Sequence, residues 1–271
     1  MAHLLKKEKD YRYIEVGEGT PIIVLHGLMG GLSNFDAVTS YFSSNGYKVI
    51  IPEQPIYSMS LIKTNVKSFA KYLKAFIDFK GLDNVILLGN SLGGHIGLYH
   101  TKIYPEKVKA LIITGSSGLY ESAMGGGYTK RSDYEVMKKK AQDVFYDPAV
   151  ATKEIVDEVY ETVNDRNKLI KTLAIAKSAI RHNMAKDLPN IKTPIALIWG
   201  ENDKVTPPEV AKEFKKQSSK IVEIIFAKRR NNDLIWFQFE EKTKLILFLC
   251  ALNSSVLTCT VEYGRDTFTN C

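Results

Sequence analysis

Short apolar segments alternate with amphipathic segments over the first 227 residues of this 271-residue chain. Segments such as Pro21–Leu25 and Val85–Leu88 are apolar throughout, which favours strands buried on both faces of a mostly parallel sheet. Flanking Gly, Pro and Asn residues and β-branched content predict seven strands, namely Tyr11–Val16, Pro21–Leu25, Tyr47–Ile51, Asn84–Leu88, Val108–Thr114, Pro194–Trp199 and Lys220–Phe226. Between them, Val66–Phe79 carries one apolar stripe, as a helix packed on a sheet does. The alternation predicts an α/β fold with helices on both faces of the sheet.

The alternation stops between residues 119 and 187, where no strand-like segment occurs. Helical periodicity instead predicts three helices, at Asp133–Phe145, Thr152–Val163 and Asn167–Met184. We therefore expect a discontinuous α/β core at residues 1–118 and 188–252, and a helical cap inserted at residues 119–187. Residues 253–271 are expected to form a disordered tail.

Composition limits the class of protein. The chain is 45% hydrophobic and 25% charged, as in a soluble globular protein. The apolar run Leu245–Leu252 is too short to cross a membrane, and Met1–Lys7 has no apolar core of a secretion signal. The net charge of +7 comes from scattered lysines with acidic neighbours. We expect a cytoplasmic protein with a small-molecule substrate or ligand, and neither a nucleic-acid nor a membrane partner.

The strongest local motif is Gly89-Asn90-Ser91-Leu92-Gly93-Gly94, which follows an apolar strand and opens a predicted helix at Leu92–Tyr104. A strand, a sharp turn and a helix form the context of a nucleophile elbow. The turn strains the serine backbone and leaves no room for side chains two residues away on either side, which explains glycine at 89 and 93. The motif predicts an exposed Ser91 hydroxyl above the sheet; the alternative is a glycine-rich turn whose serine has no catalytic role.

Two further strand ends carry candidate residues. His26-Gly27 follows Pro21–Leu25, and the glycine lets the chain cross the sheet top and direct the N–H of Leu28 toward Ser91. Together with the N–H of Leu92, this donor would form an oxyanion hole. The loop after Pro194–Trp199 offers Asp203, preferred over Glu201, as the acid that orients a histidine; ordinary turn chemistry is the alternative.

Taken together, the strand ending in His-Gly, the Gly-Asn-Ser-Leu-Gly-Gly turn, the helical insertion and Gly-Glu-Asn-Asp-Lys-Val-Thr-Pro resemble the α/β-hydrolase superfamily. The resemblance covers Tyr11–Phe226 and is to the small esterases and C–C bond hydrolases with a helical cap. It implies an eight-stranded core whose first strand is short or absent, and a cap over a pocket. It also implies Ser91 as nucleophile, Asp203 as acid, Leu28 and Leu92 as oxyanion donors, and no metal or cofactor.

One element of that pattern is missing. In the superfamily the order is Ser, then Asp or Glu, then a histidine just beyond the last core strand. Here Ala227–Leu234 contains no histidine, and none follows to Cys271. The five histidines all come earlier, at His3, His26, His95, His100 and His182. His95 is expected inside the fold and His26 to be structural, so His182 and His26 are the candidates for a substitute base.

The composition changes at the same place. Residues 228–271 hold all three cysteines, none of the nine prolines and one of the eighteen glycines. Three hypotheses remain open: a reading-frame change near residue 228 replaced the usual segment, the protein lost catalysis but kept a binding pocket, or the base was relocated.

The sequence thus predicts a serine hydrolase of small, fairly apolar ester or acyl substrates that acts through an acyl-enzyme, with activity in question because the triad base is missing. The alternatives are a non-catalytic binding protein on this scaffold, and a C–C bond hydrolase or thioesterase with a relocated base.

Overall fold

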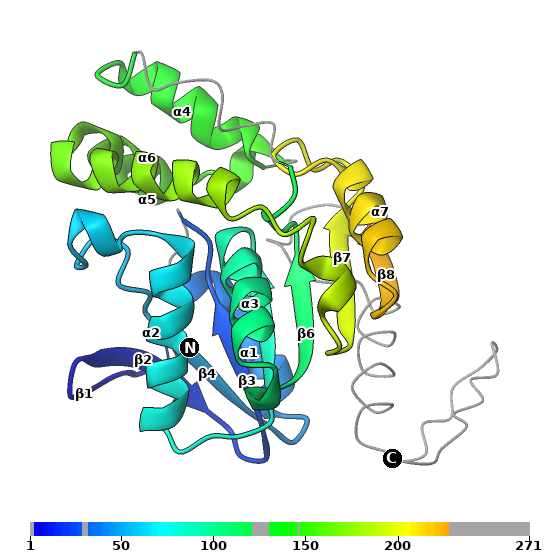
Figure 1. The fold of residues 1–271 in the computed structure, drawn as a ribbon. Coiled ribbons are helices and arrows are strands. Elements are labelled where there is room, and N and C mark those ends of the chain that lie inside the picture. Colours follow the sequence, from blue (N-terminus) through cyan, green and yellow to red (C-terminus); the bar gives the residue numbers. More distant parts are fainter. Residues whose placement is uncertain (1–2, 29–31, 121–129, 146, 228–271) are drawn as a thin grey trace, which may run out of the picture.

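The computed structural model describes residues 3–28, 32–120, 130–145 and 147–227, and it confirms the α/β fold class (Figure 1). The sheet holds eight strands in the order β1-β2-β4-β3-β5-β6-β7-β8, with β1 and β2 antiparallel to their neighbours and the rest parallel. The strands are β1 (Leu5–Glu8), β2 (Tyr11–Val16), β3 (Thr20–Leu25), β4 (Tyr47–Pro52), β5 (Val85–Asn90), β6 (Val108–Thr114), β7 (Ile195–Gly200) and β8 (Ile221–Ala227).

Helices cover both faces of the sheet, as the uniformly apolar strands predicted. The helices are α1 (Asp36–Ser43), α2 (Val66–Phe79), α3 (Leu92–Ile103), α4 (Tyr134–Asp143), α5 (Lys153–Asn164), α6 (Arg166–Arg181) and α7 (Pro208–Gln217). Short 3₁₀ turns are η1 (Leu32–Phe35), η2 (Leu61–Lys63), η3 (Pro105–Lys107), η5 (Pro148–Val150) and η6 (Leu188–Asn190). The two faces form separate cores. Ile22 and Val24 of β3 pack with α1 residues, whereas Ile23 and Leu25 pack with residues of α2, α3 and α7.

Strand β1 was not among the seven strands predicted from periodicity, although the resemblance allowed a short first strand. Its four residues include one apolar residue, Leu5, and all four are exposed or half-buried. What holds β1 is pairing with β2, where Leu5 lies opposite Ile14, together with an ion pair from Lys6 to Glu15 at 3.2 Å. An edge strand held by its backbone leaves no hydrophobic pattern in the sequence.

Some helix boundaries differ by a few residues from those predicted from the sequence. Helix α2 has the predicted limits because Asn65 caps it, accepting a hydrogen bond from the Ser68 N–H at 2.9 Å. Helices α4, α5 and α6 fall within or next to the three predicted segments. The part of the expected core after residue 227, the expected tail at 253–271 and the three cysteines lie outside the described residues.

Helices α4, α5 and α6 lie between β6 and β7 in the chain and above the strand ends in Figure 1. Helix α6 is joined to the segment that leads into α2. The Val66 N–H donates to Ser178 Oγ at 3.0 Å, and Lys171 Nζ donates to the Tyr57 carbonyl at 2.7 Å. In the described part of the chain, no helix has both the length and the apolar character that crossing a membrane requires.

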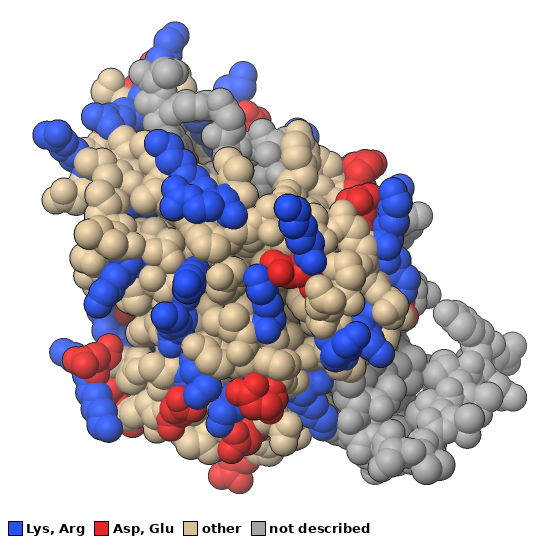
Figure 2. All heavy atoms as spheres, viewed as in Figure 1, with Lys and Arg blue, Asp and Glu red and all other residues tan. Residues whose placement is uncertain are grey.

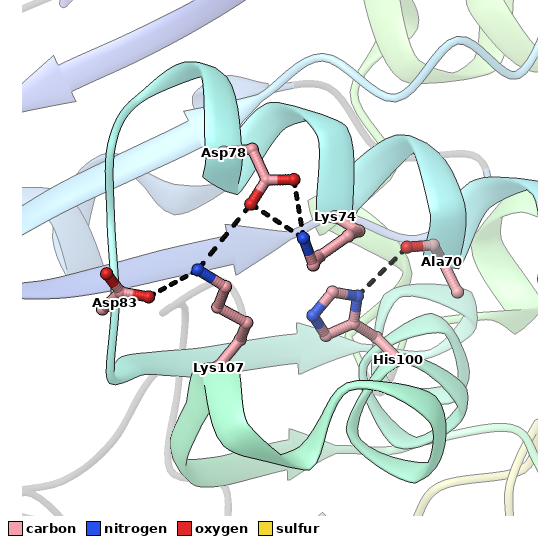
Figure 3. A network of polar contacts seen from close by, with 6 residues as sticks. All are labelled: Ala70, Lys74, Asp78, Asp83, His100 and Lys107. Atoms are coloured by element: carbon pink, nitrogen blue, oxygen red, sulfur yellow. Dashed lines mark hydrogen bonds and ion pairs between the residues drawn. The ribbon is translucent and has the colours of Figure 1, made fainter.

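A polar network joins α2 to the end of α3 and to η3 (Figure 3). His100 of α3 is buried, and its Nδ1 lies 3.0 Å from the Ala70 carbonyl, so we assign the ring proton to Nδ1. Burial lowers the pKa of His100 to about 4. Nearby, Lys74 Nζ pairs with Asp78 at 2.6 Å, and Lys107 Nζ lies 3.7 Å from the same carboxylate.

We expect stability to fall as the pH is lowered from about 7 to about 4. The unfolded chain binds a proton on His100 near its ordinary pKa of 6.5, whereas the folded chain keeps the ring neutral down to about pH 4. His100→Asn keeps a donor for Ala70 and removes the titration. Urea unfolding should show a shallower pH slope in this variant, by up to about 1.4 kcal/mol per pH unit. An unchanged slope would contradict the assignment.

Candidate active site

Ser91 is the single residue that joins β5 to α3, and its backbone is strained. Its φ is +51° and its ψ is −118°. Among the described residues, Lys9 and Asn84 are the other non-glycine residues with positive φ. Such a conformation costs about 1–3 kcal/mol and persists where the surroundings hold it in place. The strand, turn and helix predicted around Ser91 are therefore present.

The end of β6 holds this turn. The Ser91 N–H donates to the Thr114 carbonyl at 3.0 Å. The Ser91 carbonyl accepts from the N–H groups of His95 and Ser117, both at 3.3 Å. The hydroxyls of Ser117 and Ser116 reach the same carbonyl at 3.4 and 3.5 Å. Both polar groups of the Ser91 backbone are thus engaged, which fixes the turn against β6.

The glycines of the motif are required by contact. A Cβ on Gly93 would lie 2.0 Å from the Leu25 carbonyl oxygen, and a Cβ on Gly89 would lie 2.6 Å from the backbone of Gly93. A Cβ on Gly94 would lie 2.3 Å from Ser116 Oγ. Helix α3 therefore approaches β3 and β5 more closely than any other residue would allow.

The Ser91 side chain is half-buried, and no described residue makes a hydrogen bond to its hydroxyl. It stands at the N-terminus of α3, where Leu92 is the first helical residue and the helix dipole is positive. Gly27 lies next to it, because a Cβ on Gly27 would be 3.4 Å from Ser91 Cβ. The structure therefore brings Ser91, Leu92 and the Gly27–Leu28 turn together at the top of the sheet.

Asp203 lies in the loop after β7, and its carboxylate is fixed. Oδ1 accepts from the N–H groups of Val205 and Thr206, both at 2.9 Å, and Oδ2 accepts from Thr206 Oγ1 at 2.9 Å. A Cβ on Gly115 would lie 3.0 Å from Oδ2, so the carboxylate sits over the end of β6. Glu201, the alternative acid, is exposed. Ser91 and Asp203 thus flank the same strand end, that of β6.

His26 is oriented by bonds at both ring nitrogens. Its Nε2 accepts from the Gln54 N–H at 3.1 Å, so we assign the proton to Nδ1, which donates to the Gly27 carbonyl at 2.8 Å. Burial lowers the pKa of His26. The ring therefore has no free lone pair to take the Ser91 proton, and its geometry suits the structural role expected for it.

His182 follows the last residue of α6, and its ring contacts α3 about two turns beyond Ser91. Its ring packs edge-on against Tyr99, with centroids 5.3 Å apart, and its Nδ1 lies 2.9 Å from the Ser178 carbonyl. Tyr99 is eight residues beyond Ser91, which corresponds to about 12 Å of helix. His95, one turn beyond Ser91, is fully buried, and its Nε2 lies 2.9 Å from the His182 carbonyl. Burial lowers the pKa of His95 to about 4.

The position expected for a triad histidine lies outside the described residues. Strand β8 ends at Ala227, which pairs with Gly200 beside the Asp203 loop. The polar residues Thr114, Ser116 and Ser117 were missed as contacts of Ser91 by the sequence analysis, although they stand at the end of an apolar strand and just after it, which is a usable signal. Within the described residues, no three His, Cys, Asp or Glu side chains form a group that could hold a metal ion.

Gly93→Ala should destabilise the fold by about 3 kcal/mol or more, because its Cβ would overlap the Leu25 carbonyl. Gly27→Ala is the matched control, since its Cβ meets neighbours at an ordinary 3.4 Å, and it should cost at most about 1 kcal/mol. Urea unfolding measures both. Equal stability of the two variants would show that the close approach of α3 to β3 is not required.

Comparisons with known proteins agree with this geometry. The model of the alpha/beta hydrolase fold family matches residues 20–154. A 2-hydroxy-6-oxo-6-phenylhexa-2,4-dienoate hydrolase of Comamonas testosteroni is 27% identical over 216 residues, which cover 72% of this chain and 75% of that protein. A 2-hydroxy-6-oxononadienedioate/2-hydroxy-6-oxononatrienedioate hydrolase of a Pseudomonas species is 26% identical over 217 residues, covering 71% and 75%.

Solved structures extend the match. The crystal structure of an alpha/beta hydrolase enzyme from the metagenome of lagoon sediments at Mar Chica, Morocco, is 54% identical, with a TM-score of 0.72, over 91% of this chain and 97% of that one. A meta-cleavage product hydrolase of Pseudomonas fluorescens, 17% identical, shares the fold with a TM-score of 0.68 over 90% and 93%. These relatives support hydrolase activity of the α/β-hydrolase type. The chain belongs to the α/β-hydrolase family.

Proposed function

We propose that this chain is a serine hydrolase of small, fairly apolar ester or acyl substrates, with Ser91 as nucleophile. One observation carries the proposal. The Ser91 backbone is held at positive φ between β5 and α3, and its side chain is half-buried with no hydrogen bond from its hydroxyl to any described residue. A residue kept in a strained turn at the carboxyl end of a parallel sheet is placed for chemistry rather than for packing.

The proposed reaction begins with attack of Ser91 Oγ on the substrate carbonyl carbon. The negative charge that develops on the carbonyl oxygen is stabilised by the N–H groups of Leu92 and Leu28, with the N-terminus of α3 adding to the field. Collapse of the tetrahedral intermediate releases the alcohol and leaves an acyl group on Ser91. Water then hydrolyses this ester and regenerates the hydroxyl.

The proton of Ser91 needs an acceptor during attack. Asp203 is proposed to orient a base, because three hydrogen bonds already fix its carboxylate beside the end of β6. Neither His26 nor His182 is arranged to serve Ser91, and the chain has no histidine after His182. Loss of a triad histidine costs on the order of 10⁶ in turnover. We therefore propose that turnover by this sequence is low, and that a reading-frame change near residue 228 removed the base.

The three helices α4–α6 are proposed to form a cap over the site. Helix α6 is anchored on the core side by Ser178 and Lys171, which bond to Val66 and Tyr57. His95 adds a contact to the His182 carbonyl at the end of α6. The first two bonds link α6 to α2 and the segment before it, and the third links the end of α6 to α3, so the cap would define the walls of the substrate pocket.

A second candidate function is C–C bond hydrolysis, favoured by the names of the curated relatives at 27% and 26% identity. Such substrates also present a carbonyl carbon to the nucleophile, so the site described above would serve both reactions. Turnover of 2-hydroxy-6-oxo-6-phenylhexa-2,4-dienoate relative to p-nitrophenyl butyrate would rank the two. The alternative that is not an enzyme is a binding protein on the same scaffold.

A fluorophosphonate probe should label Ser91, and Ser91→Ala should abolish the labelling. Without a base the labelling should be slow rather than absent, because the oxyanion donors and the N-terminus of α3 would still stabilise the charge that develops during attack. Ser44→Ala, at an exposed helix end, is the matched control and should be labelled like the parent chain. Mass spectrometry of the labelled peptide identifies the site. Labelling that persists in Ser91→Ala, or its complete absence together with thermal stabilisation by hydrophobic ligands, would contradict the proposal.

Added imidazole should restore turnover, because it supplies the missing proton acceptor. We expect the Ser91-dependent rate on p-nitrophenyl butyrate to rise about tenfold or more with imidazole. Imidazole also hydrolyses this ester directly, so Ser91→Ala in the same buffer gives the background. Fast turnover without imidazole would show instead that the chain already contains a working base, and no Ser91-dependent increase would remove the proposed mechanism.

A further inference from the structure

Two segments that pack together carry basic residues and no acidic ones. Residues 54–77 and 166–186 contain no Asp or Glu. They contain ten basic residues, Lys63, Lys67, Lys71, Lys74, Arg166, Lys168, Lys171, Lys177, Arg181 and Lys186. The hydrogen bonds from Val66 to Ser178 and from Lys171 to Tyr57 hold the two segments side by side. On the face drawn in Figure 2, basic side chains predominate over the helical layer above the sheet.

Large aliphatic side chains are exposed on the same two segments. In η2, Ile62 is 91% exposed and Leu61 is 49% exposed. In α6, the exposed fractions are 75% for Ile180, 44% for Leu173 and 38% for Ile170. The two elements are in contact. Five aliphatic residues exposed on adjacent elements are unusual, because isolated apolar residues on a surface are normally scattered.

The spacing in α6 places these residues on one outer face. Arg166, Ile170, Leu173, Lys177 and Ile180 follow one another at intervals of four, three, four and three residues, and all five are exposed. The buried residues of α6 lie at other positions, namely Leu169, Thr172, Ile175, Ser178 and Ala179. Helix α6 therefore carries an inner face that packs on the fold and an outer stripe of two cationic and three aliphatic residues.

We propose that η2 and the outer stripe of α6, together called the η2–α6 surface, bind an anionic lipid surface. Aliphatic side chains gain free energy by entering the boundary between headgroups and acyl chains, while neighbouring lysines and arginines pair with anionic headgroups. The expectation of no membrane partner rested on the lack of a spanning segment and of a basic patch. It took no account of how exposed residues are arranged in space. The proposal does not depend on the chemistry of Ser91.

Other partners fit this surface less well. A second copy related by a two-fold axis would bring the same cations of the η2–α6 surface against one another. A nucleic acid would meet the cations but would gain little from isoleucine and leucine, since single strands bind by stacking on aromatic rings. The combination of aliphatic and cationic residues favours a lipid surface that is apolar inside and negatively charged outside.

The test is sedimentation of the full chain with lipid vesicles, carried out with Ser91→Ala so that hydrolysis cannot alter the lipid. We expect binding to phosphatidylcholine vesicles that contain about 30% phosphatidylglycerol, and much weaker binding to phosphatidylcholine alone. Two variant pairs probe the surface. Lys177→Glu with Arg181→Glu should weaken binding about tenfold or more, and Ile62→Ser with Ile180→Ser should weaken it by a similar factor.

Matched controls make the same changes elsewhere. Lys212→Glu with Lys216→Glu alters the net charge equally on exposed positions of α7, and Val222→Ser removes a 53% exposed aliphatic side chain from β8. Both should bind like the parent. All altered residues are exposed, so thermal melting should show intact folds.

Three results would overturn the proposal. The first is no binding to either vesicle. The second is binding that the charge variants weaken and the aliphatic variants leave unchanged, together with equal binding to a single-stranded RNA, which would indicate a general polyanion site. The third is a dimer in size-exclusion chromatography that Ile180→Ser dissociates, which would assign the surface to a second copy.

Discussion

The positive φ of Ser91 is the constraint on which the upper part of the molecule depends. A serine adopts this backbone only where neighbours hold it, and here four donors surround its carbonyl while Thr114 accepts its N–H. The same turn obliges α3 to start against β3, which explains why Gly93 has no room for a side chain. Packing and strain are therefore two parts of one arrangement: the close contact of helix and strand stabilises the conformation that displays the hydroxyl.

The buried histidines of the described residues connect parts of the fold. His26, His95 and His100 are buried, and burial lowers the pKa of each. His95 and His100 each lie within hydrogen-bonding distance of a carbonyl on a distant segment, and His26 Nε2 accepts from the Gln54 N–H, so each ring connects separate parts of the fold. Asp203 is different, because its carboxylate is fixed by its own loop and needs no partner on another element. The position of the Asp203 carboxylate therefore does not depend on a histidine.

Much of the fold was predictable because buried parallel strands appear in the sequence as continuous apolar runs. Helix α2 was predictable from its single apolar stripe, and Asn65 caps it. Strand β1 was not, because an edge strand depends on pairing rather than on apolar residues. The sharp turn at Ser91 and the loop that carries Asp203 followed from their motifs, and the catalytic roles of the two residues stay predictions. The serines at the end of β6 did not, because their role depends on which strands become neighbours. Likewise the net charge of +7 averages over the chain and conceals the arrangement of cations along α6.

The edge strand β1 has a consequence for how copies of the chain meet. No other strand of the described residues pairs with its outer side, and a row of unpaired backbone donors and acceptors is the feature by which sheets of separate molecules can join into continuous fibrils. Lys6 and Lys7 stand in the middle of this strand, and Lys6 is already paired with Glu15 of β2. If the β1 strand of a second copy paired antiparallel with this one, Lys6 and Lys7 of both copies would lie next to each other. The centre of the added strand carries no acidic residue to offset them. At this border, electrostatic repulsion protects the sheet against amyloid-like growth.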